Sequence, residues 1–210
     1  MQRNKTQPKL KVQMQDRFTS LEDIQKDYIL LITLPHFFEG ETDIVNHLFA
    51  DGLKRLHLRK PAATAEELER WIEAINPAYR SRIVLHDHHE LALRYELGGI
   101  HLNSRNPHAP KGFDRNRCSL SRSCHSIQEV KACHSDYDYV LLSPIYNSIS
   151  KQGYHAAFPL EELTKESKLL SQNIYALGGI TFEKLAEVKQ LGFAGAAMLG
   201  GFWEKTHQET

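Results

Sequence analysis

Short apolar runs alternate with amphipathic stretches along most of this chain. Each run spans four to seven residues, and polar or glycine-containing segments separate them. Runs of this length, rich in Leu, Ile, Val and Tyr, are typical of buried strands. We predict eight strands, at Tyr28–Leu34, Leu53–Leu58, Arg82–Leu85, Gly99–Leu102, Ser119–Ser123, Tyr139–Leu142, Ile174–Leu177 and Ala194–Leu199.

Helical patterns fill most of the segments between these runs. Two of them open on a capping box, with Thr64 followed by Glu67 and Ser126 followed by Glu129, and this spacing satisfies the first free backbone N–H groups of a helix. Another begins at Pro159, which suits the first turn. The stretch after residue 181 has Lys184 where a capping box would carry Glu.

Eight strands that alternate with helices predict a parallel sheet. Eight such units in about 180 residues favour a single-domain α/β fold of the (β/α)8 TIM barrel type. The alternative is an open doubly wound sheet, which is less favoured because no G-x-G-x-x-G motif is present. We expect an N-terminal extension over residues 1–27, a barrel over residues 28–204 and a polar tail over residues 205–210.

Composition narrows the function classes. The 26 Lys and Arg residues balance 26 Asp and Glu residues, so no overall field favours nucleic acid or a membrane surface. No apolar run approaches the length of a membrane span, and the polar N-terminus does not resemble a secretory signal. The three cysteines, Cys118, Cys124 and Cys133, have no C-x-x-C spacing. Together these features predict a cytoplasmic protein with reduced thiols.

In a (β/α)8 barrel the chemistry lies at the carboxyl ends of the strands. The loop "NSISK" after the sixth strand carries two hydroxyls and a lysine, and two glycine pairs follow the seventh and eighth strands. Glycine lets backbone N–H groups approach phosphate oxygens, so we expect a phosphate site there. The polar residues that follow the other strands are Arg59, Lys60, His86, Asp87, Asn103 to Asn106, Ser123 and His125.

Two of these segments have competing interpretations. The run "HDHH" at residues 86–89 lacks the usual His-x3-His zinc spacing, so we do not predict a transition-metal site there. Arg105 lies in a turn-rich loop, "HLNSRNPHAP", and is either an anion contact at the mouth of the barrel or a surface arginine.

The ordered set "HLRK", "VLHDHHELAL", "GIHL", "SRSCHSIQEV", "DYVLLSPIYNSISK" and "ALGGIT" resembles the thiamin phosphate synthase and thiazole tautomerase family over residues 28–203. The resemblance implies a TIM barrel of thiamin biosynthesis. The synthase branch joins a hydroxymethylpyrimidine diphosphate to a thiazole phosphate, with Mg²⁺, and releases pyrophosphate. The tautomerase branch isomerises the thiazole phosphate.

The resemblance also implies site residues, position by position. Arg59, Ser123 and Lys151 match groups that bind or neutralise the diphosphate, Lys60 stands next to the position of a further family lysine and could take its role, and Asp87 and Asn106 match the two Mg²⁺ ligands. His125 matches a histidine suited to proton transfer. The substrate-contacting positions of the family fall on His57, His86, Ser148, Ser150, Gly179, Leu199 and Gly200.

Three positions depart from the family pattern. Asn106 replaces a metal-binding carboxylate, His57 replaces a glutamine, and Pro61 replaces a lysine. An amide oxygen brings no negative charge, so we expect weaker Mg²⁺ binding. The synthase is therefore the leading interpretation, with a thiazole tautomerase and a non-catalytic binder of phosphorylated ligands as alternatives. Family members often assemble through barrel helices, so a homo-oligomer is also an open expectation.

Overall fold

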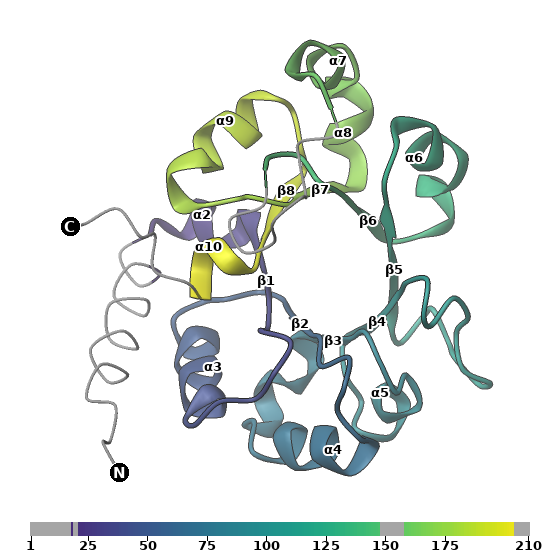
Figure 1. The fold of residues 1–210 in the computed structure, drawn as a ribbon. Coiled ribbons are helices and arrows are strands. Elements are labelled where there is room, and N and C mark those ends of the chain that lie inside the picture. Colours follow the sequence, from purple (N-terminus) through teal and green to yellow (C-terminus); the bar gives the residue numbers. More distant parts are fainter. Residues whose placement is uncertain (1–17, 19–20, 148–157, 204–210) are drawn as a thin grey trace.

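The protein is a closed eight-stranded barrel, seen here in a computed structural model that describes residues 18, 21–147 and 158–203. All neighbouring strands are parallel and follow chain order, and β1 pairs with β8 to close the barrel (Figure 1). The predicted (β/α)8 fold is thus confirmed. The strands are β1 (Ile29–Ile32), β2 (Leu56–Leu58), β3 (Ile83–Leu85), β4 (Gly99–Leu102), β5 (Ser119–Cys124), β6 (Tyr139–Leu142), β7 (Ile174–Leu177) and β8 (Gly195–Met198).

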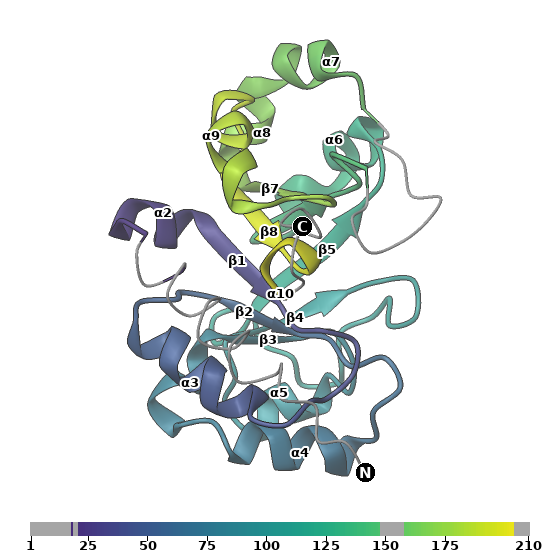
Figure 2. The same ribbon diagram turned by 60° about the vertical axis from the view of Figure 1, so that its left-hand side comes forward.

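Helices surround this barrel on most sides. Helices α3, α4 and α5 lie on the side of β2 and β3, and α6 to α9 lie on the opposite side (Figure 2). The connection between β4 and β5, residues 103–118, contains no helix. The helices are α2 (Asp23–Tyr28), α3 (Glu41–Ala50), α4 (Ala65–Glu73), α5 (Glu90–Arg94), α6 (Ile127–Cys133), α7 (Leu160–Lys165), α8 (Ser167–Asn173), α9 (Leu185–Gln190) and α10 (Gly200–Trp203), with 3₁₀ turns η1 (Pro77–Arg82), η2 (His134–Asp136) and η3 (Phe182–Lys184).

Local sequence signals explain where several helices begin. The Thr64 hydroxyl accepts a bond from the Glu67 N–H, and the Glu67 carboxylate accepts one from the Thr64 N–H, which confirms that capping box. The Ser126 hydroxyl caps α6 by accepting from the Glu129 N–H at 3.1 Å, but the box is only half formed there, because the Glu129 carboxylate accepts from the His125 N–H instead of that of Ser126. The stretch from Pro159 forms two helices instead of one, because α7 ends and α8 begins at Glu166.

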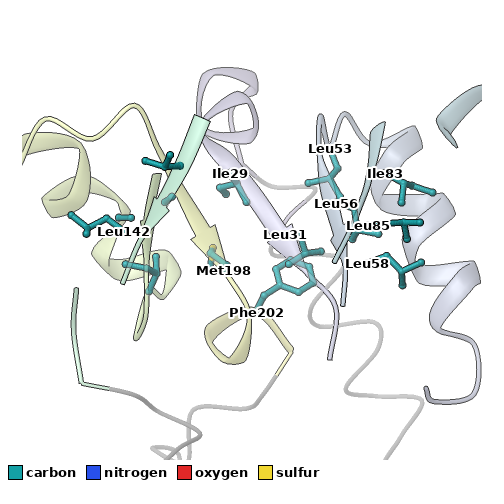
Figure 3. Close-up of a cluster of buried hydrophobic side chains, with 14 of the residues drawn as sticks. Ile29, Leu31, Leu53, Leu56, Leu58, Ile83, Leu85, Leu142, Met198 and Phe202 are labelled. Carbon is teal, nitrogen blue, oxygen red and sulfur yellow. The ribbon is translucent and has the colours of Figure 1, made fainter. Parts of the chain in front are cut away.

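Alternation along the strands creates two apolar layers. Outward-facing residues pack beneath the helices, as Figure 3 shows for Leu31, Leu56, Leu85 and Met198. The intervening residues of β1, β6 and β8 fill one half of the barrel interior with Leu30, Ile32, Leu141 and Ala197. Successive strand residues point to opposite faces, so one short run supplies both layers.

The other half of the interior is polar. His57 of β2, His101 of β4 and Ser121 of β5 are fully buried there, and His86 lies directly after β3 with little exposure. Buried polar groups must find partners or they destabilise the fold. This half of the barrel therefore depends on hydrogen bonds as well as on packing.

Three further features concern the segment before the barrel, the length of the helices and the cysteines. Phe18 is completely buried and packs edge-on against Phe202, with ring centroids 6.4 Å apart. Within the described residues, no helix combines the length and the apolar character needed to cross a membrane. The three cysteines are free and buried, and the thiols of Cys124 and Cys133 share a hydrogen bond, with their Sγ atoms 3.6 Å apart.

Candidate active site

A cavity of about 790 Å³ opens at the carboxyl ends of the strands; we call it the mouth cavity. Residues from the ends of all eight strands or from the loops that follow them line it. This is the face on which barrel enzymes carry their chemistry. Its polar and glycine lining includes His36, Arg59, His86, Asn103, Arg105, Arg122, Ser123, His125, Glu129, Ser143, Gly178, Gly179, Gly200 and Gly201.

A charged cluster lies at one side of this cavity. Asp87 Oδ1 accepts a bond from Arg105 Nη2 at 3.1 Å and another from Asn106 Nδ2 at 2.9 Å. Arg59 lines the same cavity. Burial lowers the pKa of Arg59, repulsion from Arg105 adds to this, and attraction to Asp87 opposes it. The guanidinium groups of Arg59 and Arg105 are therefore both attracted to the single carboxylate of Asp87.

Asp87 also keeps one oxygen without a protein partner. Its Oδ2 atom is buried and accepts no hydrogen bond from the described residues. The residue faces a second, adjoining pocket, the side pocket, which is also lined by Arg105, Asn106 and Pro107. A buried carboxylate oxygen without a donor is costly, so this atom is suited to an added cation or donor.

Three histidines form a network beneath the cavity. His57 Nδ1 lies 2.8 Å from His86 Nε2, and His57 Nε2 lies 2.6 Å from the Tyr139 hydroxyl. His101 bonds the hydroxyls of Ser121 and Ser123, both at 2.9 Å. Burial is the main cause that lowers the pKa of His57, His86 and His101, in the last case to about 3. The three imidazoles are therefore neutral near pH 7.

These histidines bring three ring nitrogens within 4.8 Å of one another, which invites a metal-site interpretation. The ring orientation argues against it. His86 and His101 stack with centroids 4.2 Å apart and planes only 24° apart, whereas metal ligation needs lone pairs, which lie in the ring planes, to converge on one point. Both nitrogens of His57 and of His101 are already hydrogen-bonded. The network is a satisfied polar core that supports the floor of the cavity.

Ser123 and His125 reach the cavity from the end of β5. The Ser123 hydroxyl is held by His101, and His125 Nδ1 lies 3.1 Å from the carbonyl oxygen of Ser143. The His125 backbone N–H donates to Glu129 at 2.7 Å. These contacts orient a hydroxyl and an imidazole at the mouth.

Glycines pack the loops after β6, β7 and β8 tightly together. The N–H groups of Ile145 and Tyr146 donate to the carbonyls of Leu177 and Gly178, which binds the loop after β6 to the end of β7. Gly179 has φ +63°, and a Cβ there would lie 2.3 Å from the carbonyl oxygen of Asn147. Lys184 donates to the Gly179 carbonyl at 3.1 Å and lies over the Tyr146 ring. The lysine that replaces a capping-box Glu thus stabilises this loop.

We expect Gly179→Ala to destabilise the protein more than Gly112→Ala does. Both positions have positive φ, at +63° and +85°, but a Cβ at Gly112 meets nothing within 4 Å. The left-handed backbone alone costs a non-glycine residue about 1–2 kcal/mol. The clash with the loop after β6 should therefore appear as an additional loss in urea unfolding of Gly179→Ala. Equal losses in the two variants would mean that the loops do not need this close contact.

The structure brings together many of the residues expected from the sequence. The mouth cavity contains Arg59, His86, Ser123, His125, Gly179, Leu199 and Gly200, and the side pocket contains Asp87 and Asn106. His57 is fully buried beneath the cavity, so it supports His86 and does not face a substrate. Ser148, Ser150 and Lys151 lie outside the described residues.

Lys60 is also placed differently from the expectation. It is 1% exposed, and its Nζ donates to both carboxylate oxygens of Glu41, at 2.7 and 2.8 Å, and to the His36 carbonyl at 2.7 Å. Trp71 donates to the same carboxylate. Lys60 therefore does not face the mouth cavity. Its ammonium group fixes the loop after β1 instead, because the side chain turns away from the mouth towards α3.

Sequence reasoning missed two features of this site. Arg122 lines the mouth cavity and lies over the Tyr137 ring, 5.5 Å from its centroid, although strand alternation directs it away from the interior. The feature of the sequence that could have indicated Arg122 is the turn-rich segment between β4 and β5, because it contains no helix to cover this side of the barrel. The histidine network was also missed, although His57 and His101 each stand between two apolar strand residues, at positions that face the interior.

A family model, sequence relatives and a solved structure at 39% identity relate this chain to thiamine phosphate synthases. The model of a family described as thiamine monophosphate synthase matches residues 29–202. A crystal structure of thiamine phosphate pyrophosphorylase from Bacteroides thetaiotaomicron is 39% identical, covers 87% of this chain and 88% of that chain, and has a TM-score of 0.76. The thiamine-phosphate synthase of Latilactobacillus sakei is 28% identical over 131 residues, or 60% of this chain and 58% of the relative.

A further relative has the same kind of name. The thiamine-phosphate synthase of Bacteroides fragilis strain ATCC 25285 is 25% identical over 162 residues, which covers 71% of this chain and 78% of the relative. The family match spans the barrel from β1 to α10 and includes every strand whose end contributes to the mouth cavity. The chain therefore belongs to the thiamine monophosphate synthase family.

Proposed function

We propose that this protein is a thiamine-phosphate synthase, a transferase that couples hydroxymethylpyrimidine diphosphate to a thiazole phosphate and releases pyrophosphate. The observation that carries the proposal is the pair of guanidinium groups, Arg59 and Arg105, beside Asp87 at the mouth of a barrel of this family. Departure of a diphosphate needs its developing charge to be neutralised. Arginine suits this task because its planar group binds phosphate oxygens in pairs.

The acceptor's phosphate is assigned to the opposite side of the mouth cavity. Gly179, Leu199 and Gly200 line that side, and the absence of a Cβ at the glycines lets the backbone approach an anion. Ser123 faces the diphosphate side, where His101 orients its hydroxyl. This placement sets the two substrates across one cavity, and a cavity that excludes water favours their direct reaction.

Mg²⁺ fits this site through Asp87. The buried Oδ2 atom has no donor among the described residues, and carboxylate oxygen is a preferred Mg²⁺ ligand. Asn106 would be the second ligand, although here its amide nitrogen faces Asp87. When bound, Mg²⁺ would supply positive charge for the leaving diphosphate.

The comparisons do not favour the tautomerase alternative, since the relatives reported above are named as synthases or pyrophosphorylases. His125 lines the cavity in either case and does not separate the two activities. The proposed location remains the cytoplasm, and the three free cysteines are consistent with it.

A coupling assay tests the proposed function. Purified protein, hydroxymethylpyrimidine diphosphate and thiazole phosphate should yield thiamin phosphate and pyrophosphate with Mg²⁺, and much less with EDTA. Absence of product, with thiazole phosphate still bound, would reject the synthase and direct attention to the thiazole carboxylate tautomer.

In the same assay, Arg59→Ala should lower kcat/KM by about a hundredfold, the effect of removing one preorganised charge-stabilising group. Arg117→Ala is the matched control, because Arg117 pairs with Glu96 on the surface, where its side chain is 74% exposed. A loss below threefold for Arg59→Ala would remove Arg59 from the diphosphate site.

A further inference from the structure

Arg105 lies between the mouth cavity and the side pocket and lines both. Its side chain is 45% exposed, while that of its partner Asp87 is 11% exposed. The loop around it is well defined, because the side-chain oxygen of Asn103 accepts bonds from the backbone N–H groups of Arg105 and Asn106. Among the described residues, Asp87 is the one side-chain partner of this guanidinium, through Nη2. A guanidinium has five N–H donors, so several remain for a ligand in the cavity.

The charges around this position do not balance. Arg59 and Arg105 share Asp87, while Asn106, which contacts the same carboxylate, is neutral. Two other carboxylates line the cavities: Glu129 lines the mouth cavity and accepts from the His125 N–H, and Glu90 lines the side pocket and lies 3.6 Å from His88.

The nearby lysine does not add to this charge, because Lys60 is paired with Glu41 away from the cavity. Arg59, Arg105 and Asp87 together therefore carry one net positive charge before any ligand or metal binds.

We propose that Arg105, held by Asp87, binds a diphosphate directly, so that this site takes up the diphosphate group without a divalent cation. The inference rests on the proposed function for the identity of the ligand. Asp87 fixes one edge of the guanidinium, and the other donors reach the cavity beside Arg59. A divalent cation would then contribute to the coupling step and would not be needed for binding.

Calorimetric titration with inorganic pyrophosphate in the presence of EDTA tests this proposal. The wild-type protein should bind, and Arg105→Ala should bind about 10- to 100-fold more weakly, as expected for the loss of hydrogen bonds to a charged group. Arg105→Lys should recover part of the affinity, because a point charge remains without the paired geometry. Arg117→Ala should bind like the wild type.

A double variant provides the converse test. Arg105→Ala with Asn106→Asp removes the fixed cation and adds a second carboxylate, so pyrophosphate binding should require Mg²⁺. Failure of the wild type to bind pyrophosphate in EDTA, or equal binding by Arg105→Ala, would overturn the inference. A wild type that couples with Mg²⁺ but does not bind in EDTA would refute this inference alone. One that binds in EDTA but never couples would refute the proposed function and not the anion site.

Discussion

Lys60→Met is expected to lower the free energy of unfolding by about 3–5 kcal/mol, which is typical when one partner of a buried ion pair is removed. Lys60 and Glu41 are almost completely buried, with exposed side-chain fractions of 1% and 2%. Burial raises the pKa of Glu41 and lowers that of Lys60, so each charge is held in place mainly by the other. Without Lys60, the Glu41 carboxylate would be buried with Trp71 as its remaining side-chain donor.

Urea unfolding of a matched set of variants checks this expectation. Lys60→Met with Glu41→Gln should recover much of the loss, because the glutamine is neutral and can still accept from Trp71. Lys54→Met is the control, since Lys54 and Asp27 form an exposed pair, with side chains 61% and 60% exposed, and such pairs contribute about 0–1 kcal/mol. Similar losses for Lys60→Met and Lys54→Met would show that the buried pair contributes no more to the free energy of unfolding than the exposed pair does.

This pair shows what the sequence could and could not predict. The eight strands were predictable because each is a short apolar run between polar turns, and three of the predicted spans have the observed bounds. The position of Lys60 directly after β2 placed it correctly at the carboxyl end of the barrel. The direction of its side chain depends on Glu41, which is 19 residues away in sequence, and on Trp71, which is 30 residues from Glu41; the two belong to different helices. No local pattern reports such a contact.

The same limit applies to the candidate site. Strand-end rules correctly led to Arg59, His86, Ser123 and His125, because all strands of the barrel end at one face. The ion pair between Asp87 and Arg105 depends on how the turn after β4 folds back towards β3, which the sequence does not specify. For that reason Arg105 could be named as a candidate anion contact but not as the partner of Asp87.

The buried histidines should make the fold sensitive to acid. His57 and His101 are neutral in the folded protein, where burial lowers their pKa, to about 3 for His101. In the unfolded chain a histidine has an ordinary pKa near 6.5. Between about pH 3 and 6.5 the unfolded state therefore binds more protons than the folded state does, and stability falls as the pH falls. Each such histidine should contribute a loss of about 2 kcal/mol between pH 7 and pH 5.

Chemical denaturation at a series of pH values measures this dependence. His101→Asn should be less stable than the wild type at pH 7, because its bonds to Ser121 and Ser123 are weakened or lost. Its stability should nevertheless fall less steeply below pH 6.5, by about 1.4 kcal/mol per pH unit, since one titrating group has been removed.

The slope distinguishes two roles for the polar half of the barrel. If His101 were protonated in the folded state, removing it would leave the slope of the wild type unchanged. A reduced slope means that the folded barrel holds a neutral imidazole between two serine hydroxyls, with His86 stacked on it at 4.2 Å. Such a neutral floor adds no positive charge beneath the cavity. The field at the mouth then comes chiefly from the guanidinium groups that line it, Arg59, Arg105 and Arg122, and from the carboxylates that oppose them.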